Sequence, residues 1–129
     1  MFRTVLLPLV LVFGVVFSQS SAHAQPTIDN PTGGFDITAT NQNYGAQFTA
    51  DVANLYYSMI FEYEVTPGVW SQLGSNGVYV TTTGSMNLNV QLGTLGPGTY
   101  YNGRVKLIKM TGKPPYPTVT VTGHFRGAP

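Results

Sequence analysis

Between residues 35 and 126, apolar and polar side chains alternate in short runs along the chain. In the clearest run, SMNLNVQL, the apolar residues Met86, Leu88, Val90 and Leu92 are separated by Asn and Gln. This period of two is the repeat of a strand with one buried face. The other runs with this pattern are FDITAT, QFTADV, MIFEYEV, YNGRVKL and TVTVTGHF, with VWSQL and VYVTTT as shorter examples.

Turn-forming residues separate these runs. They are Pro67-Gly68, Asn76-Gly77, Gly84-Ser85 and the segments 93–98 and 111–117. About seven short strands at this spacing predict an all-β fold, an antiparallel two-sheet β-sandwich that begins at residue 35 and ends at residue 129. Parallel strands would be apolar on both faces, so the alternation argues against a parallel sheet.

The first 24 residues have a different character. Arg3 precedes an apolar run from Val5 to Phe17, and Ala22-His23-Ala24 follows it. A charged start, an apolar middle and a small-residue cleavage site are typical of a secretory signal peptide. The alternative is a membrane anchor, but the run is shorter than the about 20 residues that span a bilayer. We therefore expect a signal peptide over 1–24 and an exported protein, periplasmic or extracellular, without a membrane partner after cleavage.

The segment 25–34, QPTIDNPTGG, is polar and rich in turn residues. We interpret it as a mobile lead-in or as a frayed first strand. The sequence leaves open whether the first strand begins near Thr27 or near Phe35.

The net charge and the cysteine content limit the kinds of partner and the class of protein that the sequence allows. The chain has six basic and five acidic residues, and Arg3 would leave with the signal peptide, so the mature chain would be neutral. A neutral chain lacks the basic surface that nucleic acids require. The chain contains no cysteine, so its core must be held by packing alone. The absence of both cysteine and an Asn-x-Ser/Thr acceptor favours a bacterial exported protein.

One motif suggests a family. The stretch LGPGTYY precedes the run YNGRVKL, and this order resembles the crossover corner of fibronectin type III domains within the immunoglobulin-like group. The resemblance implies that Leu95 plugs the core, that Pro97-Gly98 makes the turn, and that Tyr101 is buried with its hydroxyl bonded to nearby main chain. Including Val90, Leu92 and the strand pattern around FEYEV, the similarity extends from residue 48 to residue 125.

The chain departs from that family in two places. The usual tryptophan of the second strand has no counterpart between Phe48 and Val52. Gly103 stands where the family carries a bulky apolar residue, and Trp70 is one candidate to fill that space. These departures make the broader immunoglobulin-like group the safer assignment.

The charged and histidine residues do not form a recognisable catalytic set. Glu62 and Glu64 would face Arg104 and Lys106 on a neighbouring strand, as cross-strand ion pairs that fix register. His124 is the single histidine that would remain after cleavage, and the sequence supplies no metal-binding or nucleophile motif around it. We expect a protein that is not an enzyme and that needs no cofactor or metal.

Several aromatic residues are candidates for binding. Tyr56 and Tyr57 follow Asn54 and would lie in a connection between strands, and Lys113 and Tyr116 lie in another connection. In the predicted topology both connections emerge at one pole of the sandwich, where exposed tyrosines make good contacts. The alternative is that these tyrosines fold back onto the core. Burial of all three tyrosines would refute a binding site there.

The last strand offers a different mode of binding. TVTVTGHF carries no acidic or basic residue other than His124, and it would form a sheet edge open to another chain. We therefore expect a non-catalytic binding or assembly module that contacts another protein or itself through this edge. The alternative is a small carbohydrate-binding module, with a glycan stacked on exposed Trp70, Tyr56, Tyr57 or Tyr79.

Overall fold

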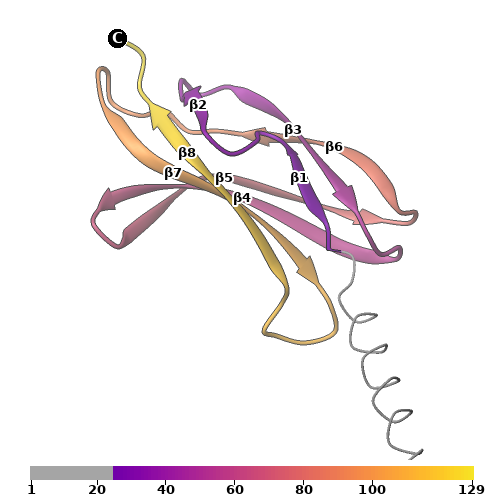
Figure 1. The fold of residues 1–129 in the computed structure, drawn as a ribbon. Helices are drawn as coiled ribbons and strands as arrows, with labels where there is room; N and C mark the ends of the chain where they lie inside the picture. The colour runs from indigo at the N-terminus through magenta and orange to yellow at the C-terminus, as the bar shows by residue number, and fades with distance from the viewer. Residues whose placement is uncertain (1–24) are drawn as a thin grey trace, which may run out of the picture.

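The computed structural model describes residues 25–129, which form two facing β-sheets (Figure 1). No helix occurs in this range, and therefore none that could cross a membrane. A three-stranded sheet has the order β1-β3-β6, and a five-stranded sheet has the order β2-β8-β7-β4-β5. The strands are β1 (Thr27–Asn30), β2 (Phe35–Thr38), β3 (Asn43–Ala50), β4 (Leu55–Thr66), β5 (Val69–Val80), β6 (Gly84–Gln91), β7 (Tyr100–Met110) and β8 (Thr118–Arg126). The predicted all-β two-sheet sandwich is confirmed, with eight strands. The predicted signal peptide lies outside the described residues.

The inward faces of the two sheets form one apolar core. Phe48 of the smaller sheet packs against Tyr57 of the larger sheet, with ring centroids 5.4 Å apart. Phe61 and Phe125 pack against each other, with ring centroids 6.1 Å apart, and all four side chains are fully buried. Each buried aromatic side chain contributes about 2–3 kcal/mol through removal of apolar surface from water. The alternation in the sequence therefore identified most of the buried positions.

The N-terminal segment is a correction to the sequence prediction. β1 lies within 25–34 and pairs with β3, so the first strand begins at Thr27, which was one of the two alternatives left open, and the mobile lead-in is the wrong one. The chain then crosses to the other sheet, where β2 pairs with β8 in parallel. The prediction of a purely antiparallel sandwich is wrong at this edge. The sequence argues against parallel strands because they are usually apolar on both faces. β2 is an exception, since it is a short edge strand with Asp36 exposed on its outer face.

The structure of β5 also differs from the sequence prediction. Asn76-Gly77 was predicted to be a turn between two short strands, but both residues lie inside the continuous strand β5. The Asn76 amide donates a hydrogen bond to the Asn89 carbonyl of β6, 2.7 Å away, which links the edges of the two sheets. Gly77 is needed because the Tyr56 ring lies where its Cβ would be. Local turn preference is overridden by these two contacts.

Two of the three roles predicted for the LGPGTYY stretch, which connects β6 to β7, are confirmed. Leu95 is buried in the core. Pro97-Gly98 makes the turn, with Gly98 at φ 77° and the Thr99 amide donating to the Gly96 carbonyl. The third part is wrong: Tyr101 is only partly buried, and within 25–129 its hydroxyl makes no protein hydrogen bond. Tyr101 packs instead against Tyr63, with ring centroids 5.1 Å apart.

Candidate functional site

Three of the four residues predicted to bind lie near one pole, because Tyr56 pairs with Met110 at the end of β7, and Lys113 and Tyr116 lie in the connection that follows. Tyr56 and Tyr57 lie in β4 and not in a connection, so adjacent side chains point to opposite faces of the sheet. Tyr56 is 44% exposed on the outer face, whereas Tyr57 is fully buried and cannot contact a partner. Lys113 is exposed and Tyr116 is half-buried in the connection between β7 and β8. The site predicted from the sequence is therefore wrong for Tyr57.

Tyr57 belongs to a partly buried polar network at that pole. Its hydroxyl oxygen accepts a hydrogen bond from the Val52 amide at 3.0 Å, and it lies 3.0 Å from both Asp51 Oδ1 and the Val52 carbonyl. Lys109 Nζ donates to Asp51 Oδ2 at 2.8 Å. Tyr57 thus has the role that the sequence assigned to Tyr101, at a different corner of the sandwich.

The Asp51 carboxyl is ionised in this network. Burial alone would raise the pKa of Asp51, but hydrogen bonds from Lys109 and Tyr57, together with the Lys109 charge, lower it below its usual range. The network joins the start of the β3–β4 connection to the end of β7, because Asp51 and Lys109 lie at those positions. Its role is to hold the pole together.

The aromatic platform considered for glycans is not formed. Tyr57 is buried, and Tyr56 pairs with Tyr79 directly across β4 and β5. Trp70 lies near the other end of β5, paired with Glu64. The four rings therefore do not form a row on one surface.

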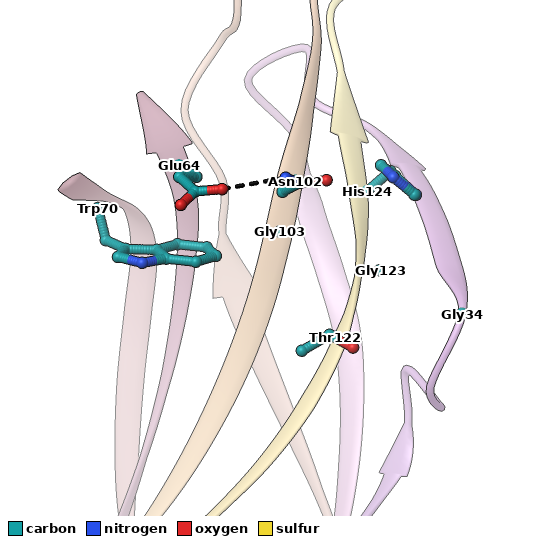
Figure 2. A pocket seen from close by; sticks show the side chains of 8 residues that line it. All are labelled: Gly34, Glu64, Trp70, Asn102, Gly103, Thr122, Gly123 and His124. Carbon is teal, nitrogen blue, oxygen red and sulfur yellow. Dashed lines mark hydrogen bonds between the residues drawn. The ribbon is translucent and has the colours of Figure 1, made fainter. Parts of the chain in front are cut away.

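A shallow groove does lie on the outer face of the five-stranded sheet. We call it the outer groove; its volume is about 400 Å³. Figure 2 shows Trp70 on one side and His124 on the other, with Asn102 between them. The residues that line it are Gly34, Glu64, Trp70, Asn102, Gly103, Thr122, Gly123 and His124. Five of them point outward from four neighbouring strands, so strand parity was the signal that could have grouped them.

Two hydrogen bonds fix the carboxylate of Glu64 at the wall of the groove. Asn102 Nδ2 donates to Glu64 Oε1 at 3.0 Å, and the Gly68 amide donates to Glu64 Oε2 at 2.7 Å. These two bonds lower the pKa of Glu64, with a smaller effect from the charge of Arg104. Glu64 is therefore an anion fixed in one orientation at the wall of the groove.

The predicted cross-strand ion pairs are confirmed for Glu62. Arg104 Nε lies 2.7 Å from Glu62 Oε1, and Lys106 Nζ lies 3.3 Å from the same oxygen. The Arg104 guanidinium also lies 4.0 Å from the centroid of the Trp70 ring. Glu64 takes no part in these ion pairs, because its oxygens are engaged by Asn102 and Gly68.

Trp70 does not fill the space beside Gly103. The Phe125 ring occupies the position of the missing side chain, and a Cβ on Gly103 would collide with it. Phe35 fills the corresponding space at Gly123. Trp70 lies instead on the outer face with Arg104, and His124 stacks on Tyr100 with ring centroids 4.6 Å apart. Within residues 25–129, no three acidic or histidine side chains gather as a metal site would require.

β8 has a half-open edge. Lys109 N donates to the Pro117 carbonyl, so alternation along the antiparallel ladder turns the main-chain groups of Thr118 and Thr120 away from β7. β2 covers the far side of β8 only from Gly123 to Arg126, and Gly34 N donates to the Thr122 carbonyl at its start. In the described part of the chain no strand pairs with the outer edge over residues 118–121. The predicted open edge is present over half of β8 and covered over the other half.

No protein-family model matches the chain, and no curated protein matches it in sequence. Among solved structures, it is similar to the crystal structure of CBD12 from CALX1.2, with a TM-score of 0.43 and 9% identity. The similarity covers 81% of this chain but 44% of that one, so the chain spans less than half the length of that structure. At this similarity neither a ligand nor a function transfers.

Proposed function

We propose that this protein is an exported, non-catalytic binding or assembly module of the immunoglobulin or fibronectin type III-like kind. It acts through contact with another protein, and the partner we propose first is a second copy of the chain. The half-open edge of β8 is the observation that carries this proposal. The signal-like segment 1–24 supports export, and the buried Leu95 with its Pro97-Gly98 turn supports the family.

The chemistry of the edge suits strand addition. Thr118 and Thr120 are exposed, and their main-chain groups have no partner strand among the described residues. Natural sheets usually block such an edge with a charged side chain, a proline or a bulge. The segment 118–121, TVTV, has none of these. An added strand would satisfy these main-chain groups and extend the five-stranded sheet.

A second copy is a suitable occupant because it presents the same segment. Two such edges can pair antiparallel about a twofold axis, which gives a closed dimer. β2 limits the extent of that pairing, since it already occupies the edge from Gly123 onward. The proposed contact is therefore short, and we expect an association that depends on protein concentration.

The test is the mass of the purified protein in solution over a range of concentrations, by light scattering after size-exclusion chromatography. Thr120→Pro removes an amide that faces away from β7, so the fold tolerates it while strand addition is blocked. Thr120→Val keeps the amide and serves as the matched control. A dimer that is lost in Thr120→Pro and retained in Thr120→Val supports the proposal. A monomer at all concentrations, or a dimer insensitive to Thr120→Pro, rejects the edge as a self-association surface.

A further inference from the structure

The outer groove combines one fixed aromatic ring with several polar groups that lack protein partners. From this combination we infer a second binding site, for a neutral saccharide stacked on Trp70 and hydrogen-bonded by Asn102 and His124. This inference is independent of the β8 edge. It also differs from an aromatic platform, because it uses a single ring in a groove.

Trp70 is held in place before any ligand arrives. The Arg104 guanidinium lies 4.0 Å from the ring centroid, and Arg104 Nε is fixed by Glu62 Oε1 at 2.7 Å. The same indole lines the groove. A ring fixed by a cation and its ion pair loses little conformational freedom on binding, and this favours affinity. An aromatic face is the surface on which the C–H groups of a sugar ring pack.

The polar groups of the groove are suited to hydroxyls. Asn102 uses one amide hydrogen on Glu64, and its carbonyl oxygen remains available as an acceptor. Within residues 25–129, no protein hydrogen bond engages the side chains of Thr122 or His124. His124 is nevertheless oriented, because its ring stacks on Tyr100 at an interplanar angle of 12°. Neighbouring donors and acceptors of this kind match a ligand that carries several hydroxyl groups.

Charge and size favour a small neutral ligand. The fixed carboxylate of Glu64 repels anions, and the nearby cations Arg104 and Lys106 are both engaged by Glu62. One carboxylate without further acidic ligands does not make a metal site. The volume of about 400 Å³ lies within the range of small-molecule sites, about 300–1,000 Å³. A sugar unit of an oligosaccharide fits these limits.

Trp70 is the single tryptophan of the chain, so intrinsic tryptophan fluorescence reports on this groove alone. The full protein is titrated with cellotetraose, xylotetraose, chitotetraose and maltotetraose at up to millimolar concentrations. We expect a saturable change in fluorescence with at least one of these probes. A protein carrying Thr120→Pro should bind the same probe with unchanged affinity, because the β8 edge is not involved.

Three variants identify the residues responsible. Asn102→Ala and His124→Ala should each weaken binding about tenfold or more in the fluorescence titration. Trp70→Ala should abolish binding, because it removes the ring on which the sugar stacks. This variant has no tryptophan fluorescence, so its binding is measured by calorimetry. Tyr79→Ala removes an aromatic side chain that is 57% exposed elsewhere on β5, and should leave the affinity unchanged. Thermal unfolding of each variant confirms that it is folded.

Two results would overturn the inference. The first is the absence of a saturable response to all four oligosaccharides, or a response that Asn102→Ala and His124→Ala leave unchanged. The second is a fluorescence change that follows protein concentration without any sugar and is not displaced by sugar. That second result would assign the groove to a second copy of the chain.

Discussion

Lys109 Nζ lies 2.8 Å from Asp51 Oδ2, and the two side chains are only 13% and 7% exposed. They join the end of β7 to the residue that follows β3, two elements far apart in the sequence. The Tyr57 hydroxyl lies 3.0 Å from the other oxygen of the same carboxylate. One charged group therefore anchors a pole of the sandwich that has neither a cysteine nor a cluster of metal-ligating side chains among its described residues.

Removal of Lys109 should be strongly destabilising. Lys109→Met keeps the apolar stem but leaves the partly buried Asp51 carboxylate without a counter-charge, which we expect to lower the free energy of unfolding by about 1–3 kcal/mol. Urea denaturation measures the change. The double variant Lys109→Met with Asp51→Asn should be less destabilised than Lys109→Met alone, since no unpaired charge remains. A double variant at least as unstable as the single one would contradict this account.

Stability should fall in acid because of Asp51. The pKa of Asp51 is lower in the folded protein than in the unfolded chain, where it is about 3.9. Between the two pKa values the unfolded chain binds the proton, so the contribution of Asp51 is complete above the unfolded pKa and is lost as pH falls through the folded one. The denaturation midpoints of the native protein and of Asp51→Asn should therefore begin to converge as pH falls below about 4 and meet below the pKa of Asp51 in the folded protein. A constant difference from pH 7 to acid would exclude Asp51 as the source.

The Tyr57 hydroxyl, which bonds to nearby main chain, should contribute to stability. Tyr57→Phe removes the hydroxyl that bonds the Val52 amide and the Asp51 carboxylate, and we expect a loss of about 1–3 kcal/mol. Tyr101→Phe is the matched control, because the Tyr101 hydroxyl makes no protein hydrogen bond within the described range. The free energies of unfolding of both variants are compared by chemical denaturation. Equal effects of the two substitutions on the free energy of unfolding, or a larger effect of Tyr101→Phe, would contradict the assignment of the stabilising hydroxyl to Tyr57.

Gly103 should tolerate no side chain. Gly103→Ala would drive a Cβ into the ring of Phe125 in the core, with an expected cost of about 1–3 kcal/mol from overpacking. Gly45→Ala is a matched strand substitution whose nearest contact is Asn89 Oδ1 at 4.0 Å, and it should be close to neutral. Thermal unfolding of the two variants distinguishes a packing constraint from a general effect of strand glycines.

The sequence predicted the fold class because the evidence for it is local. Alternation at Met86, Leu88 and Val90 reports one buried face whatever the neighbouring strand. Strand pairing is not local, so the parallel contact of β2 with β8 was not visible in either segment. The same limit explains Asn76-Gly77, where a turn preference is overridden by contacts with Asn89 and Tyr56.

The candidate sites were predicted less well for a related reason. The predicted run began at Met59, but β4 begins at Leu55, and the same alternation carried back from Met59 places Tyr57 on the buried face and Tyr56 on the outer face. The outer groove draws residues from four strands and from Gly34, and the side chains that line it share only outward parity. The open edge at Thr118 and Thr120 was predicted from composition, but the portion covered by β2 depended on the fold.

The parallel arrangement of β2 and β8 also has a mechanical consequence. When a pull on the two ends of the chain reaches this pair, it drags the start of β2 and the end of β8 in opposite directions along the strand axis. The four registered residue pairs from Phe35↔Gly123 to Thr38↔Arg126 would then be loaded together in shear. An antiparallel hairpin pulled from its open end would instead give way one pair at a time, like a zipper. Force applied through the ends would thus be resisted by these four pairs together, a property that the free energy of unfolding does not report.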